Sequence, residues 1–301
     1  MGDGVTDEQR AWAKAHMSTL AEPMPQLAPT PQPPQSLAAL PYDLAADLRD
    51  REALATKQLG PNARTKTTRN AWLLVAPSAA GLGANSAFVE RTLAAYMNDR
   101  FATEPQRALS VYLFSNDATY QAYCKKELGA KCISIYGFYE PSSRALVMNV
   151  STGLGTLSHE LVHPIVEADF PRAPTWINEG IASLFEQPVF PREGEVHGAK
   201  NWRYRRISEG LASKTERPQV SLAALFAWDD TTFRDEQETL HYAVARYACQ
   251  WMDEKGWLWP FYKRWRDHVE EDPSGRASFA AVTGASVEDA DARWMTWLKR
   301  I

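Results

Sequence analysis

The sequence has no apolar run that approaches the roughly 20 residues needed to cross a bilayer. It also lacks an excess of one charge, because 33 lysines and arginines stand against 37 aspartates and glutamates. The first ten residues, MGDGVTDEQR, do not follow the basic and then apolar layout of a signal peptide. These absences argue against a transmembrane segment and against nucleic acid as a partner. They leave open both a cytosolic protein and an exported one whose leader has been removed.

Cysteine is scarce, with three in the chain. The sequence has no Cys-x-x-Cys pair, which argues against a zinc site made of thiolates. Cys124 and Cys132 flank the short polar segment KKELGAK, which a disulfide could close. Three reduced thiols are the equal alternative, because spacing alone fixes no connectivity. Cys249 stands alone in a helical pattern. The Cys124/Cys132 pair and a proline-rich N-terminal segment favour an extracytoplasmic location, which is periplasmic, secreted or at the cell surface.

Two regions differ in composition. Residues 1–69 contain a predicted short helix at 6–21, and then a segment, 23–41, that holds seven of the 19 prolines. Proline fixes φ and removes a hydrogen-bond donor, so this segment is expected to be an extended linker. The folded domain is predicted to be residues 70–301.

The pattern of residues 70–301 predicts an α+β fold with a small mixed β-sheet. Apolar and β-branched runs indicate strands, and apolar residues recurring at three and four positions indicate helices. The predicted elements are strands at 71–77 and 109–115, helices at 85–101 and 116–129, and a hairpin at 135–151. After Gly155 the pattern is almost wholly helical. The domain therefore divides into an α/β part, 70–187, with an active-site helix pair, and an all-helical part, 188–301.

The segment HELVH, residues 159–163, contains two of the six histidines in the chain. On a helix, His159 and His163 lie on one face about one turn apart, so both imidazoles can reach a single ion. Glu160 is angled off that face and can reach a water molecule beside the ion. This is the pattern of two metal ligands and a general base. Helices that bind no metal can also contain these five letters. The prediction of a metal site therefore needs a third ligand from elsewhere in the sequence.

A catalytic zinc site has three protein ligands and one open position. Glu167 would lie about 12 Å along the helix axis from His159, so we expect it outside the ligand set. Glu179 lies in a second predicted helix, WINEGIASLFE, sixteen residues after His163, which is far enough for the chain to turn back. Two nitrogens and one carboxylate oxygen suit zinc. The sequence therefore predicts a Zn²⁺ site formed by His159, His163 and Glu179.

HELVH followed by WINEGIASLFE resembles the gluzincin zinc metallopeptidases, the superfamily of thermolysin and aminopeptidase N. The C-terminal stretch, with LHYAVARYACQWMDEKG, is similar to bacterial peptidase-MA-like domains. The resemblance implies a gluzincin-like fold, with His159, His163 and Glu179 as zinc ligands and Glu160 as the catalytic base. It also implies an oxyanion donor on a later helix, which is either Tyr242 or His241. The Gly-x-Met-Glu-Asn signature of aminopeptidase N is absent, which favours an endopeptidase.

Several other residues have two interpretations. Arg203, with Arg205 and Arg206, could bind a substrate carboxylate, but we expect a solvated helix face. The strand 145–150 could form a sheet edge that receives an extended peptide. His197 is interpreted as an exposed loop residue, as are His16 and His268. The tryptophans after residue 250 are expected to pack between helices.

The interpretation that unites these observations is a zinc-dependent metallopeptidase acting on a peptide or protein substrate. Glu160 would take the proton of the attacking water and pass it to the leaving amine, while Tyr242 or His241 would stabilise the oxyanion. One alternative is a zinc-containing module that binds peptide or cell-wall material without turnover. Another is a hydrolase of non-peptide amides or esters. The presence of Glu160 favours catalysis, since a structural zinc does not need that carboxylate.

Overall fold

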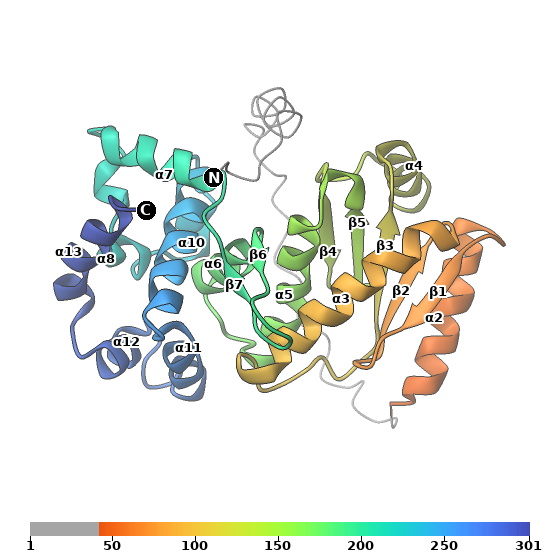
Figure 1. The fold of residues 1–301 in the computed structure, drawn as a ribbon, viewed down its shortest axis with the longest axis horizontal. Coiled ribbons are helices and arrows are strands. Elements are labelled where there is room, and N and C mark those ends of the chain that lie inside the picture. The colour runs from red at the N-terminus through yellow and green to blue at the C-terminus, as the bar shows by residue number, and fades with distance from the viewer. Residues whose placement is uncertain (1–41) are drawn as a thin grey trace. The chain divides into compact units, whose positions relative to one another are not determined.

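A five-stranded mixed β-sheet forms one part of the computed structural model, which describes residues 42–301 (Figure 1). The strands lie in the order β1-β2-β3-β5-β4, where β2, β3 and β5 are parallel and the two edge strands are antiparallel to their neighbours. Their bounds are β1 Arg64–Thr67, β2 Trp72–Ala76, β3 Leu109–Phe114, β4 Gly137–Glu140 and β5 Ala145–Asn149.

Helices cover both faces of this sheet because its central strands are apolar on both sides. Leu73 and Val75 of β2 face a core shared with α2 (Leu44–Leu59) and α4 (Asp117–Glu127). Leu74, next to them, faces the larger core with α3 (Ala79–Asp99) and α5. The 3-10 turn η3 (Val150–Thr152) then leads from β5 into α5 (Gly155–Asp169). The mixed sheet, the hairpin β4–β5 and the helices around them confirm the predicted α+β class.

The predicted domain boundary at residue 70 is wrong, because the compact unit begins at Tyr42. In α2, Ala55 is fully buried and Arg51 donates to Ser110 Oγ of β3 over 3.0 Å. β1 pairs along its length with β2. These elements were missed because α2 buries little of its surface and β1 is mostly exposed, so neither has a clear apolar period. The predicted helix at 6–21 and the proline-rich segment lie outside the described residues.

A bundle of helices makes up the rest of the described chain. It starts with α6, which forms a pair with α5, and the long helix α10 runs through its middle (Figure 1). The helices are α6 Thr175–Leu184, α7 Arg203–Ala212, η4 Arg217–Gln219, α8 Leu222–Leu225, α9 Asp230–Phe233, α10 Glu238–Glu254, α11 Leu258–Asp267, α12 Arg276–Thr283 and α13 Val287–Leu298. None of the helices of residues 42–301 combines the length and the apolar character that a bilayer crossing needs.

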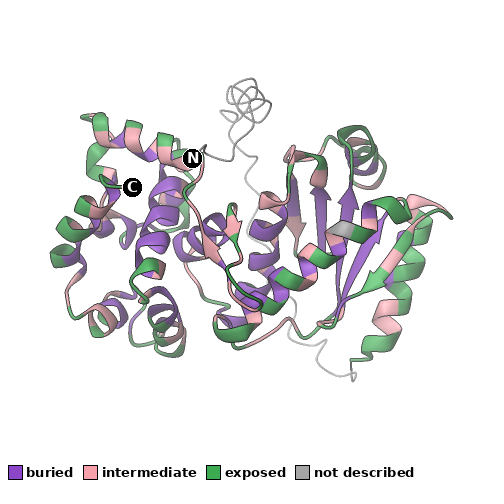
Figure 2. Ribbon diagram, in the orientation of Figure 1, coloured by how far each residue is buried: buried purple, intermediate pink, exposed green. Residues whose placement is uncertain are grey.

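The core of the bundle is largely aromatic. Trp176, Trp251, Trp265 and Trp294 are fully or almost fully buried, as expected for tryptophans that pack between helices. Figure 2 shows α6 and much of α10 as buried along most of their length. The prediction that the chain after residue 188 is all-helical needs one correction. A two-stranded sheet of β6 (Pro188–Val189) and β7 (His197–Gly198) interrupts the helices.

The three cysteines form one disulfide and leave one free thiol, as in the first of the two interpretations of the sequence. Cys124, at the end of α4, is bonded to Cys132 in the segment before β4. Cys249, on α10, is free and buried. The interpretation with three reduced thiols is therefore not what the structure shows.

Candidate metal centre

Helix α5 carries both histidines of the HELVH segment toward α6. His159 and His163 are one turn apart, and their ring centroids are separated by 4.9 Å. His159 is buried, while His163 is partly exposed. The helix position therefore places two imidazoles side by side at the surface where α5 meets α6.

Helix α6 brings Glu179 against both rings. Glu179 Oε2 lies 3.4 Å from His159 Nε2 and 3.9 Å from His163 Nε2. One ligand atom from each of the three residues can be chosen so that all lie within 4.8 Å of one another. Tetrahedral zinc with bonds of about 2.1 Å separates its ligand atoms by about 3.4 Å. The structure thus brings together the three predicted ligands at a spacing close to that of a zinc site.

The far nitrogen of each ring faces another side chain, in a hydrogen bond for His163 and in an ion-pair contact without hydrogen-bond geometry for His159. His163 Nδ1 lies 3.0 Å from Asn178 Oδ1, and His159 Nδ1 lies 3.4 Å from Glu186 Oε1. Such contacts fix the orientation of ligating histidines and leave the other nitrogen for the ion. Neither partner is recognisable from the sequence pattern as part of the site, although Asn178 directly precedes Glu179.

One buried oxygen supports the fit of a cation. Glu179 Oε1 accepts from Arg234 Nη2 over 3.2 Å, but Glu179 Oε2 is buried without a hydrogen-bond partner in the described structure. An unsatisfied buried carboxylate oxygen costs free energy. A zinc ion between this atom and the two Nε2 atoms would satisfy it, so the donor set fits the metal that the sequence predicts.

The charges of the cluster also favour the binding of a cation. Burial alone would lower the pKa of His159, but its contacts with Glu179 and Glu186 outweigh burial and raise it to about 10. Burial would raise the pKa of Glu179, but His163 and His159 nearby lower it well below its usual range. The carboxylates therefore create a site that prefers a positive charge, and metal binding would release the proton that His159 otherwise holds.

Glu160, the predicted base, lies beside the ligands without joining them. Its Oε2 is 3.9 Å from His163 Nε2, and its side chain is mostly buried. Glu167, on the same helix, accepts instead from the Tyr139 hydroxyl over 2.9 Å. The expectation that Glu167 is no ligand agrees with this contact.

The two residues predicted as alternative oxyanion donors have different surroundings. His241 is buried, its Nδ1 lies 3.1 Å from the carbonyl oxygen of Phe233, and its ring centroid is 4.1 Å from that of Trp228. Tyr242 lies near enough to Glu179 for its charge to act on the hydroxyl, and its ring centroid is 4.9 Å from the Arg203 guanidinium carbon. Burial, and then the negative charge of Glu179, raise the pKa of the Tyr242 hydroxyl, which therefore stays protonated as a donor. Tyr242 therefore lies nearer to the cluster, while His241 belongs to the helical core.

The expectation of a solvated arginine face on α7 is wrong for Arg203. The Arg203 side chain is 13% exposed and makes a two-point ion pair with Glu186. Arg205 is 71% exposed and pairs with Glu209, as expected for a solvated position. Nothing in the sequence pattern distinguished Arg203, because the partner that buries it comes from another part of the chain.

Close packing between α6 and α10 fixes the backbone beside Glu179. At Gly180, an added Cβ would lie 2.8 Å from Cys249 Sγ and 3.0 Å from the Ala245 carbonyl oxygen. The first distance is shorter than real Cβ atoms show, and the second is tighter than nine in ten of their contacts. Glycine at this position therefore lets the two helices touch, and the contact sets the depth of Glu179 in the site.

The remaining histidines of the described chain lie elsewhere. His197 was expected to be a plain exposed residue, but its ring bridges Asp253 and Glu195 with two contacts of 2.9 Å. His268 is exposed, and His16 lies outside the described residues. His197 therefore links β7 to α10 and is not one of the metal ligands.

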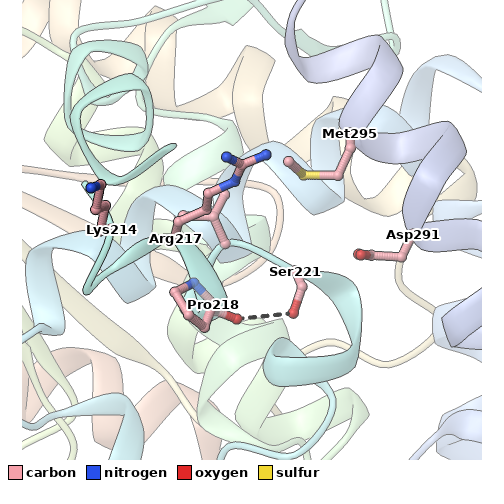
Figure 3. A pocket seen from close by; sticks show the side chains of 7 residues that line it. Lys214, Arg217, Pro218, Ser221, Asp291 and Met295 are labelled. Atoms are coloured by element: carbon pink, nitrogen blue, oxygen red, sulfur yellow. Dashed lines mark hydrogen bonds between the residues drawn. The ribbon is translucent and has the colours of Figure 1, made fainter. Parts of the chain in front are cut away.

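The structure also has a surface depression of about 380 Å³, and the residues that line it are different from those of the His159, His163 and Glu179 cluster. Figure 3 shows Asp291 and Met295 of α13 opposite Arg217 and Ser221. Ser221 Oγ donates to the Pro218 carbonyl oxygen over 3.3 Å. None of the metal-site residues lines this depression, so it contributes nothing to the chemistry of the site.

Comparison of the sequence with protein-family models gives no match, and comparison with curated proteins gives none either. The function must therefore be argued from the geometry of the residues.

Proposed function

We propose that this protein is a zinc-dependent metallopeptidase of the gluzincin type. The observation that carries the proposal is the convergence of His159 Nε2, His163 Nε2 and the unpartnered Glu179 Oε2, with Glu160 beside them. A structural zinc site is closed by four protein ligands. The described residues offer three at this position, which leaves one coordination position for catalysis.

The metal supplies Lewis acidity when bound, lowering the pKa of water and polarising a carbonyl oxygen. The side chains perform the proton transfers. Glu160 accepts the proton of the attacking water and later delivers it to the leaving amine. The Tyr242 hydroxyl donates a hydrogen bond to the oxyanion of the tetrahedral intermediate.

The proposed peptide-binding edge of the sheet is β4. The strand 145–150, expected to be the edge, is β5 and lies between β3 and β4. Strand β4 forms the edge of the sheet and packs beside α5, the helix with both histidines. An extended peptide could pair with its free backbone groups and pass the metal site. Binding along an edge strand suits cleavage within a chain, which supports an endopeptidase over an aminopeptidase.

We further propose that the protein works outside the cytoplasm. The Cys124–Cys132 disulfide supports this, because disulfides persist in oxidising compartments and are rare in the cytosol. Free thiols at both positions in protein recovered from its native compartment would contradict the proposed location.

The function is tested by removing and restoring the metal. We expect purified protein to contain about one zinc per chain and to digest casein. Dialysis against a chelator should abolish both, and added Zn²⁺ should restore both. Zinc content is measured by elemental analysis and cleavage by release of acid-soluble peptides. Zinc with bound peptide but no cleavage would favour the binding module, whereas a chain without zinc affinity would rule out both.

Tyr242→Phe tests the proposed oxyanion donor. The variant keeps the ring that packs near Arg203 and removes only the hydroxyl, so kcat should fall by about 10²- to 10³-fold with little change in KM. Steady-state kinetics on one peptide substrate measure both constants. The matched comparison is His241→Asn, whose amide can still donate to the Phe233 carbonyl oxygen. A loss of kcat confined to the His241 variant would reverse the assignment.

A further inference from the structure

We propose that Glu186 and Arg203 are positioning residues that hold His159 in the orientation required for metal binding and connect it to Tyr242. This inference rests on the proposed zinc site but adds residues that neither the HELVH segment nor its ligand set contains. Glu186 follows the end of α6, and Arg203 begins α7.

The carboxylate of Glu186 is held from two sides. Arg203 Nε donates to Glu186 Oε2 over 2.8 Å and Arg203 Nη2 donates to Oε1 over 2.6 Å. Asn201 Nδ2 donates to Oε2 over 2.9 Å. Glu186 Oε1 also faces His159 Nδ1 at 3.4 Å. A carboxylate fixed by these three donor groups has one orientation, and it presents Oε1 to the His159 ring in an ion-pair contact without hydrogen-bond geometry.

Burial makes this arrangement more than a surface ion pair. The Glu186 side chain is 11% exposed and His159 is buried. In such surroundings a two-point pair between a guanidinium and a carboxylate is strong and directional. Without Arg203, the Glu186 charge would be left poorly compensated, and its carboxylate would turn toward solvent or draw the His159 ring out of place.

The same guanidinium also contacts the proposed oxyanion donor. Its carbon lies 4.9 Å from the ring centroid of Tyr242 and 4.3 Å from that of Trp202. Arg203 therefore contacts two aromatic rings while it holds Glu186. One side chain of α7 thus connects the residue behind a metal ligand with a residue that would contact the substrate.

Zinc affinity of the metal-free protein is the first measurement. We expect Glu186→Gln and Arg203→Met to raise the Kd for Zn²⁺ by about 10- to 100-fold, as is usual for residues that orient a ligating histidine. Competition with a chromophoric chelator gives this Kd. The visible spectrum of the Co²⁺-loaded variants should shift, because it reports the ligand geometry. Arg203→Lys keeps the charge without the two-point geometry and should recover only part of the affinity.

Kinetics at saturating zinc test the connection of Arg203 to Tyr242 separately from metal binding. With the metal restored in this way, Arg203→Met should still have a lower kcat than Glu186→Gln at similar KM, because only the arginine variant removes the contact with Tyr242. Equal kcat values for the two variants would overturn the connection to Tyr242.

Arg206 and Glu216 provide a matched control. Arg206 lies on the same helix and makes a two-point pair with Glu216, at 2.7 and 3.0 Å, away from the metal ligands. Arg206→Met and Glu216→Gln should leave zinc affinity and the cobalt spectrum unchanged. Unchanged zinc affinity in the Glu186 and Arg203 variants, or an equal loss in the control pair, overturns the proposal while the zinc site stands. Failure of the unaltered protein to bind zinc overturns the zinc site itself.

Discussion

Glu160→Gln should reduce peptide hydrolysis by about 10²- to 10⁴-fold while the protein keeps its zinc. Glutamine has nearly the size and shape of glutamate but cannot accept the proton of the attacking water. Glu160 Oε2 lies 3.9 Å from His163 Nε2 and outside the three-residue cluster, so its replacement removes no proposed ligand. Rates on a peptide substrate, elemental analysis and the melting temperature together separate turnover from binding and folding.

The control for this variant is Glu167→Gln, on the same helix. Glu167 accepts from the Tyr139 hydroxyl and contacts none of the proposed ligands in the described structure, so its replacement should leave kcat near that of the original protein. Cleavage at the original rate by Glu160→Gln would show that Glu160 is not the base. Loss of zinc from the same variant would show that Glu160 has a role in binding the metal.

Glu179→Ala should lower zinc content well below one per chain. The substitution removes the single carboxylate among the proposed ligands and leaves two imidazoles on one helix. It also removes the acceptor for Arg234 Nη2, so the positive charge of Arg234 beside the metal position would be less compensated. His159→Ala and His163→Ala should have similar effects. Elemental analysis after dialysis into metal-free buffer measures the loss.

Glu167→Ala again provides the comparison, because it removes a carboxylate of α5 that lies outside the cluster and should leave zinc content unchanged. Full zinc retention by Glu179→Ala would eliminate Glu179 as the third ligand.

The parts of the molecule that could be predicted from sequence are those with a local physical signal. Two histidines four residues apart on a helix must share a face, and Glu179 stood out because a second helix followed after a short turn. The strands β2 and β3 were recognised from apolar, β-branched runs. By contrast, β1 is short and mostly exposed, so the start of the domain was placed too late.

The parts that could not be predicted depend on contacts between distant segments. Arg203 has the sequence surroundings of a solvated helix residue, and its pair with Glu186 and its contacts with the Trp202 and Tyr242 rings bury it. Arg234 contacts Glu179 from the end of α9 without any motif that could have indicated it. The edge of the sheet was also misassigned, because a hairpin pattern does not reveal which of its two strands pairs with a third.

The contact at Gly180 has a consequence for local unfolding. Because α6 packs closely against α10 there, unfolding of α10 would remove a main support of the helix that carries Glu179. Zinc would bind the state in which α10 is packed on α6 and not the state in which α10 is unfolded. It would stabilise the packed state by RT ln(1 + [Zn]/Kd), about 4 kcal/mol at a thousandfold excess over Kd. Amide hydrogens of α10 should therefore exchange more slowly in the zinc-loaded protein, although α10 provides none of the proposed ligands. A chain depleted of zinc would become open to proteolysis at the helix that forms the centre of its core.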